Sequence, residues 1–326
     1  MTIPLTIDAS ELQALIHQVG RGAKGARPID RTQAAKLFGA MLDGAIPELE
    51  LGALLLAYRI KGETPDELRG FLDAAMPRFA PIVAPDDRPL VVIPSYNGAR
   101  HLPNLVPLLA ARLRDLGLAV LVHGVATDPK RITSAAVFVH MGVAAAGNAV
   151  QASQALAQHG LAFITIDALH PPLARLLALR WRLGVRSSAH SAVKIIQPAT
   201  QCALQLVNVT HPEYLAAMRD YFSLYPAPVM LLRGTEGEAV AHARRTPAIE
   251  WLHAGQSQTV VEATVGTVSA LPELPAAIDP ATTARWIEQA LRGERAIPAS
   301  IQLQVTAIQR ITSHASHAGH VTPAAP

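Results

Sequence analysis

The stretch Leu90-Val91-Val92-Ile93, directly after Pro89, is the one from which the fold of this chain can be read. An unbroken apolar run rich in β-branched residues is typical of a strand that is buried on both faces. Similar runs follow along the chain with helical stretches between them. The further strands are expected at 118–122, 162–166, 203–209, 229–232 and 260–268, and helices at 104–116, 281–291 and 301–311. Strands that alternate with helices predict an α/β domain with a mainly parallel central sheet.

The N-terminal part of the chain carries start signals for helices instead. Asp8, Asp30 and Thr64 are each followed three residues later by Glu or Gln, which is the pattern of a capping box. The helix expected at 48–61 is almost wholly apolar in its middle, so we expect it to be buried, between subunits. The sequence therefore predicts a helical domain over 1–80, an α/β domain over 81–311 and a flexible tail over 312–326.

The composition narrows the class of protein. Half of the 326 residues are apolar, which is ample for a large core, but no apolar stretch is long and charge-free enough to span a membrane. The first ten residues lack the basic and apolar regions of a signal peptide. The single cysteine excludes an internal disulfide and a cysteine-based metal site. Aromatic residues make up 4%, too few for a broad platform that stacks on bases. We expect a cytoplasmic protein without a membrane segment.

The charge of the chain is concentrated in one segment. Between Pro129 and Pro212 there are seven basic residues and one acidic residue, Asp167, a net charge of +6 against +3 for the whole chain. The basic residues are Lys130, Arg131, Arg175, Arg180, Arg182, Arg186 and Lys194. Solvated helix faces usually mix charges of both signs, whereas 171–200 holds no carboxylate at all. We therefore expect an anionic partner, for which a polyphosphate backbone is the simplest candidate.

Four motifs resemble one enzyme family. They are AMLDG at 40–44, RIKGETP at 59–65, ALHPP at 168–172 and RWRLGVR at 180–186. In this order they are similar to the anthranilate phosphoribosyltransferases of glycosyltransferase family 3, which are related to the class II nucleoside phosphorylases. The resemblance implies a small helical domain joined to a large α/β domain, with the segment at about 170–197 packed back on the helical domain. It also implies a homodimer formed through the small domains.

The motifs of this family that carry catalysis are altered. The family has a glycine-rich loop for pyrophosphate after its first strand, but here Ser95, Tyr96, Asn97 and Gly98 stand there, followed by Arg100 in place of an aspartate. A pyrophosphate held by backbone N–H groups needs residues without bulky side chains. After the second strand, His123 and Gly124 remain, while the family's lysine and asparagine are missing. We interpret these residues as a vestigial phosphate loop and a vestigial substrate site.

The family's paired acids for magnesium are also incomplete, because Glu238 is followed by Ala239. Two oxygen ligands hold Mg²⁺ on a phosphate far better than one. We therefore expect no catalytic residues, no metal and no cofactor. His123 then reads as a relic or as a core histidine. Tyr96 reads as a plug of the vacated phosphate site or as a ring that stacks on a base or sugar.

With this gain of positive charge, the chain resembles a branch of the family whose members are understood to bind nucleic acid without sequence preference. This branch also implies a role for the basic loop with Arg21, Lys24 and Arg27. We expect DNA, or RNA, to be bound by these residues, by Arg100 and by the basic residues of the 129–212 segment, assisted by N–H groups of loop 96–100. The alternatives are a phosphoribosyltransferase or pentosyltransferase with altered substrate or magnesium use, and a small-anion sensor.

Overall fold

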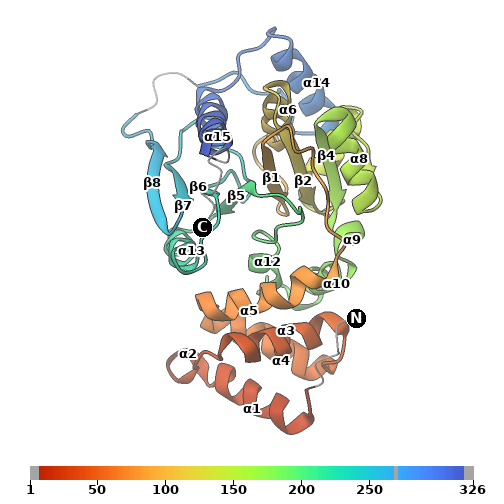
Figure 1. Cartoon of the computed structure of the whole chain (residues 1–326), viewed down its shortest axis with the longest axis vertical. Coiled ribbons are helices and arrows are strands. Elements are labelled where there is room, and N and C mark those ends of the chain that lie inside the picture. The colour runs from red at the N-terminus through yellow and green to blue at the C-terminus, as the bar shows by residue number, and fades with distance from the viewer. Residues whose placement is uncertain (1–6, 268–270, 319–326) are drawn as a thin grey trace, which may run out of the picture.

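Helices build the N-terminal domain in the computed structural model, which describes residues 7–267 and 271–318 (Figure 1). The helices are α1 (Ala9–Gly20), α2 (Gly22–Gly25), α3 (Arg31–Asp43), α4 (Glu48–Lys61) and α5 (Pro65–Ala75), followed by the 3₁₀ turn η1 (Met76–Arg78). Capping boxes open α3 at Asp30 and α5 at Thr64, as predicted, and the Asp8 side chain accepts a hydrogen bond from the Glu11 N–H. These local signals fix where the helices begin.

Helix α4 has two apolar faces. Leu54, Leu55 and Tyr58 are buried within the domain. On the other face Leu49, Leu56 and Ile60 are 82%, 42% and 67% exposed. The domain itself therefore buries only part of the helix that was predicted to be buried.

The second domain is organised around one sheet with the strand order β3-β4-β2-β1-β5-β6-β7-β8. The strands are β1 (Leu90–Ser95), β2 (Ala119–Gly124), β3 (Ala145–Ala146), β4 (Leu161–Thr165), β5 (Ala203–Val209), β6 (Val229–Arg233), β7 (Ile249–His253) and β8 (Gln256–Val261). Neighbouring strands from β3 to β6 run parallel, and β7 and β8 pair antiparallel at one edge. All residues of β1 and β2 are buried. The predicted α/β fold with a mainly parallel sheet is confirmed.

Helices cover both faces of this sheet. The helices of this domain are α6 (Val106–Asp115), α7 (Ser134–His140), α8 (Ala149–His159), α9 (Ile166–Leu169), α10 (Pro171–Ala178), α11 (Arg180–Leu183), α12 (Ala189–Ala192), α13 (Pro212–Leu224), α14 (Pro280–Leu291) and α15 (Ala299–Ala318). Of these, α10 and α12 lie between the sheet and the helical domain (Figure 1). Alternate residues of each strand face opposite sides. Val91 and Ile93 pack with α6, α7, α14 and α15, whereas Leu90 and Val92 share a core with α8 and α13.

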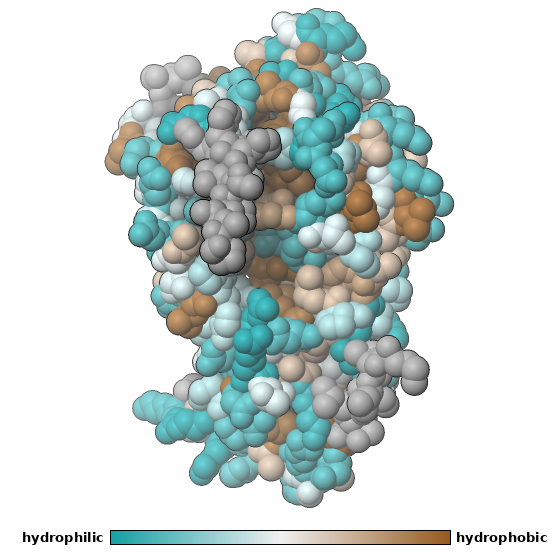
Figure 2. Space-filling model, in the orientation of Figure 1, coloured by the Kyte–Doolittle hydropathy of each residue, from teal (hydrophilic) through white to brown (hydrophobic). Residues whose placement is uncertain are grey.

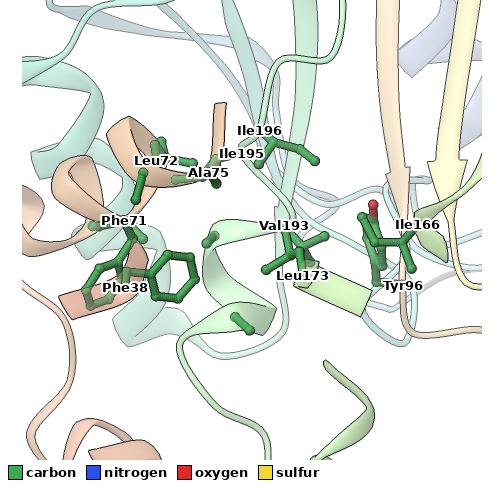
Figure 3. Close-up of a cluster of buried hydrophobic side chains, with 14 of the residues drawn as sticks. Phe38, Phe71, Leu72, Ala75, Tyr96, Ile166, Leu173, Val193, Ile195 and Ile196 are labelled. Atoms are coloured by element: carbon green, nitrogen blue, oxygen red, sulfur yellow. The ribbon is translucent and has the colours of Figure 1, made fainter. Parts of the chain in front are cut away.

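The core that contains Leu90 and Val92 continues into the helical domain. Figure 3 shows side chains that lead from Phe38 and Phe71 in the helical domain, past Leu173 and Val193, to Tyr96 at the end of β1. The His170 ring also forms a hydrogen bond with the carbonyl oxygen of Ala75 at 3.2 Å. On the face shown in Figure 2, hydrophobic residues lie in the recess between the two domains. A continuous core fixes the two domains relative to one another.

Two predicted elements at the C-terminal end are wrong. The strand expected at 260–268 lies earlier, as β8, because a hairpin at Ala254 and Gly255, both with positive φ, pairs it with β7. Strand β7 itself was not predicted. Helix α15 does not end at Ile311 but continues to Ala318, into the segment predicted as a tail. The rest of that tail, 319–326, lies outside the described residues.

Candidate functional site

The loops that follow parallel strands meet at one edge of the sheet, the edge that faces the helical domain (Figure 1). Such an edge is where α/β proteins commonly bind ligands. Here the loops after β1, β2, β5 and β6, together with α11 and the turn after it, enclose an open pocket of about 720 Å³. Its lining includes Arg100, Lys130, Arg131, Arg180 and Arg186, and we call it the cationic pocket.

The five cations of the cationic pocket face a single carboxylate in its wall, that of Glu236. Their charges disfavour one another. Burial, with Arg180 and Arg131 nearby, lowers the pKa of Arg186 to about 10. Burial also lowers the pKa of Arg180, and Arg131 adds to this, while Asp128 opposes it. An anion in the pocket would relieve this repulsion.

Lys194 lies next to the cationic pocket, in a neighbouring hollow that Arg186 also lines. Its Nζ donates hydrogen bonds to the carbonyl oxygens of Asn208 and Gly237, at 3.3 and 3.5 Å. Burial and the charge of Arg186 lower the pKa of Lys194 to about 8. Lys194 therefore adds positive charge next to the cationic pocket, although it does not line that pocket.

Other cations of the same segment already have partners within the chain. Arg182 is absent from the pocket lining and forms a two-pronged ion pair with Glu48 of α4, with both distances at 3.1 Å. Arg180 lies 3.4 Å from Asp128, whose side chain is buried. Arg175 donates to the carbonyl oxygen of Leu42 at 2.6 Å. The expectation that these cations lack carboxylate partners is wrong for Arg180 and Arg182, because the partners come from distant parts of the chain.

The basic loop of the helical domain does not line the cationic pocket. Arg21, Lys24 and Arg27 are exposed on and beside α2. Arg27 donates to the carbonyl oxygens of Lys24 and Ala26, at 3.2 and 3.0 Å. The structure thus brings together five of the predicted basic residues and leaves this trio on a separate surface.

The vestigial phosphate loop is already filled by carboxylates. The N–H groups of Asn97 and Gly98 donate to Oε1 of Glu238, at 2.8 and 2.5 Å. Those of Arg100 and His101 donate to the Glu236 carboxylate, at 2.6 and 3.0 Å. The expectation that N–H groups of this loop assist an external anion is therefore wrong for these amides. We call the four N–H groups, at positions 97, 98, 100 and 101, the amide cradle.

Close packing holds the turn at residues 236–238, which carries Glu236 and Glu238, against the amide cradle. A Cβ atom at Gly237, which has a φ of +90°, would collide with the Asn97 side chain. Arg131 donates to the carbonyl oxygens of Gly98 and Glu236, at 3.2 and 3.4 Å, and so ties the loop to the turn. From the sequence, Glu238 was expected only as the remainder of an incomplete magnesium pair, and this role was not predicted. No local signal reveals it, because the two loops meet only in the folded chain.

Tyr96 and His123 form a buried pair. Tyr96 is 3% exposed, and its hydroxyl group lies 2.6 Å from Nδ1 of His123. Burial lowers the pKa of His123 to about 3 and raises that of Tyr96, so both rings are neutral. Neither residue lines the cationic pocket, but Tyr96 lines a smaller pocket beside it.

Gly124 and Ser95 also serve the core. A Cβ atom at Gly124 would collide with the carbonyl oxygen of Ser95, where β1 and β2 run side by side. The Ser95 hydroxyl group donates to that of Ser134 at 2.7 Å. Within the described ranges, 7–267 and 271–318, no three or more His, Cys, Asp and Glu side chains gather as a metal site would require. In the same ranges no helix has the length and hydropathy needed to cross a membrane.

Comparisons with known proteins agree with this architecture. The helical bundle domain of the glycosyl transferase family matches residues 13–77. The uncharacterized protein YbiB of Escherichia coli K12 is 40% identical over 308 residues, which are 94% of this chain and 96% of YbiB. Anthranilate phosphoribosyltransferase of Actinobacillus succinogenes is 28% identical over 189 residues, 58% of this chain and 56% of that enzyme.

Two solved structures show the same fold. Anthranilate phosphoribosyltransferase of Thermus thermophilus aligns with a TM-score of 0.70 at 21% identity, over 95% of this chain and 90% of that one. The enzyme of Saccharomyces cerevisiae, in complex with phosphoribosyl pyrophosphate and magnesium, aligns with a TM-score of 0.72 at 12% identity. That alignment covers 94% of this chain and 90% of the yeast chain.

Proposed function

Because the chain belongs to the family of YbiB and is built on the scaffold of the anthranilate phosphoribosyltransferases, we propose that it binds nucleic acid without sequence preference. The observation that carries the proposal is the cationic pocket, whose wall holds five basic side chains and the carboxylate of Glu236, with Asp128 as a second carboxylate beside Arg180. That carboxylate, on Glu236, is already engaged by two backbone N–H groups. The pocket therefore has an excess of positive charge that a phosphate backbone can neutralise.

The contacts would be made by side chains. Arg100 and Lys130 are exposed at the pocket, whereas Arg131, Arg180 and Arg186 are half-buried. Contacts to phosphates position a protein on nucleic acid but carry no information about the bases. If each of the five cations neutralises one phosphate of a duplex, log affinity falls against log salt with a slope of about −4.5. DNA and RNA both satisfy this chemistry, and the cytoplasm, where both occur, is the location we expect.

A homodimer is part of the proposal. The exposed residues Leu49, Leu56 and Ile60 lie on one face of α4, at spacings that align them along a helix. An apolar stripe of this kind is typical of a surface that packs against another chain. Two chains joined through α4 would place two cationic pockets on one particle, and a long polymer could then bind both.

The second candidate is a phosphoribosyltransferase or pentosyltransferase with altered substrate or magnesium use. Homology favours this scaffold, and the yeast relative was solved with phosphoribosyl pyrophosphate and magnesium. In this chain, however, Glu236 and Glu238 occupy the amide cradle that would hold a pyrophosphate. A small-anion sensor, the third candidate, would bind a nucleotide as well as it binds a long strand.

The experiment that tests the proposal compares wild type with Arg180→Gln/Arg186→Gln on random-sequence oligonucleotides. Glutamine is preferable to glutamate, because Arg180→Glu would set a second carboxylate beside Asp128. We expect affinity to fall at least tenfold and the salt slope to become shallower by about one for each arginine lost. Arg285→Gln/Arg310→Gln, which alters two exposed residues outside the pocket, is the matched control. Equal binding by wild type and the Arg180/Arg186 variant would contradict the proposal.

A further inference from the structure

Trp181 is the large aromatic side chain that stands in the wall of the cationic pocket. It lies on α11 and is 50% exposed. The guanidinium group of Arg180 lies over its ring, 4.2 Å from the ring centroid. A cation on one part of an indole ring, with the rest of the ring open to solvent, leaves a flat surface for a second planar group.

Trp181 also lines a second, smaller pocket of about 200 Å³ on the side towards α10. We call it the side pocket. Ile166 and Leu177 give it apolar walls, and Asp167 and Thr127 add exposed polar groups. Such a combination suits a heterocycle, which is apolar on its faces and forms hydrogen bonds along its edge. Trp181 and Arg180 line both pockets, so a ligand with phosphates in one could place a ring in the other.

We propose that Trp181 stacks on an unpaired base of a nucleic acid whose phosphates lie in the cationic pocket, and that the ligand is therefore single-stranded. This inference rests on the proposed function and adds the ligand class to it. Bases in a duplex already stack on one another and offer no free face, whereas those of a single strand do. Stacking is tolerant of sequence, since every base has a π-face. One tryptophan suffices for one base, so the low aromatic content of the chain is no obstacle.

The test separates base from phosphate. Wild type, Trp181→Ala and Trp181→Phe are titrated with three ligands of equal length: a single strand, a duplex and an abasic strand that keeps the phosphates. We expect Trp181→Ala to lose about tenfold or more of its affinity for the single strand, in DNA and RNA alike. Its affinity for the duplex and for the abasic strand should stay that of wild type. Trp181→Phe, which retains a flat ring, should keep most of the single-strand affinity.

The outcomes distinguish this inference from the proposed function. If wild type binds none of the three ligands, the proposed function fails. If wild type binds all three and Trp181→Ala binds the single strand equally well, stacking by Trp181 is wrong and the proposed function stands. Trp181 is half-exposed, so its replacement should leave the melting temperature close to that of wild type.

Intrinsic fluorescence provides a second readout in the same proteins. The chain has three tryptophans, of which Trp286 is 5% exposed and Trp251 is stacked on His253. A base on Trp181 should quench the emission of wild type when a single strand is added. The abasic strand should leave that emission unchanged, and Trp181→Phe should show no quenching by either strand. Equal quenching of wild type and Trp181→Phe would contradict the inference, because the signal would then come from the other two rings.

Discussion

The backbone N–H of Gly98 donates a hydrogen bond of 2.5 Å to the carboxylate of Glu238. The two residues come from the loops after β1 and β6, and the carboxylate is almost completely buried. Burial raises the pKa of Glu238, while the N–H groups of Gly98 and Asn97 and the charge of Lys194 favour its ionised form. The chain thus supplies its own carboxyl group to the loop that the family resemblance implies would hold a pyrophosphate.

Removal of both carboxyl groups should open the amide cradle. We expect Glu236→Ala/Glu238→Ala to be less stable than wild type, because the buried N–H groups of Asn97 and Gly98 lose their partner. A buried N–H group without a partner costs about 1–3 kcal/mol. Inorganic pyrophosphate should bind the variant and raise its melting temperature, but should leave wild type unchanged. Calorimetric titration and thermal melts check this. Glu213→Ala/Glu262→Ala, at two exposed positions, is the control. A variant that neither loses stability nor responds to pyrophosphate would show that the two carboxyl groups do not occupy the amide cradle.

Lys194 should make stability depend on pH in a defined direction. Its pKa in the folded chain is about 8, below the usual 10.5, so the unfolded chain binds more protons between these values. The contribution of Lys194 to stability therefore becomes more favourable as pH rises from about 8 to 10.5. Lys194→Met removes this contribution, and its stability relative to wild type should be higher at pH 7 than at pH 10. Urea denaturation of both proteins at the two pH values measures the difference. A constant difference would mean that Lys194 titrates normally.

Tyr96→Phe tests the plug interpretation. The variant loses the hydrogen bond to His123, whose imidazole is fully buried. We expect a loss of about 1–3 kcal/mol in the free energy of unfolding, since a buried polar group is left without its partner. Affinity for oligonucleotides should change little, because the hydroxyl group bonds to His123 and phenylalanine keeps the ring that lines the side pocket. A large loss of affinity at unchanged stability would instead mean that the Tyr96 hydroxyl group contacts the ligand, because phenylalanine keeps the ring.

The apolar stripe of α4 can be tested by a charge. Leu56→Arg should convert a dimer to a monomer, which light scattering coupled to gel filtration would detect. It should also weaken binding to long strands more than binding to short ones, because two linked pockets no longer act together. Val139→Arg places the same charge on α7 at a residue that is 69% exposed. If both variants keep the mass of wild type, α4 is not the interface.

Local signals in the sequence were sufficient for much of the fold. The capping boxes at Asp30 and Thr64 and the buried run at 90–93 depend on neighbouring residues, and the structure has them where they were predicted. The end of α15 was predicted too early, because the polar residues after Ile311 interrupt its apolar pattern. Strand β7, with Trp251 at its centre, lies between β6 and the edge strand β8, and its pairing with β8 depends on the hairpin that follows.

The candidate site could be predicted only in part, because its contacts join distant segments. The charge of the 129–212 segment indicated a cationic surface, and Arg131, Arg180 and Arg186 do line one pocket. The ion pair between Arg182 and Glu48 depends on how α11 packs beside α4, which no local pattern reports. The same holds for the contact of Glu238 with Gly98. Trp181 was not predicted as a site residue, because the motif at 180–186 was interpreted only for its arginines and its family resemblance.

The measurement that tests the central claim most directly is fluorescence anisotropy of labelled random-sequence oligonucleotides, at several lengths and salt concentrations. Phosphoribosyl pyrophosphate with magnesium serves as the competitor. We expect binding that tightens with length, weakens with salt at a slope of about −4 to −5 on duplex, and barely responds to the competitor. Binding that is weak, independent of length and displaced by the competitor would contradict the proposal and favour the phosphoribosyltransferase alternative.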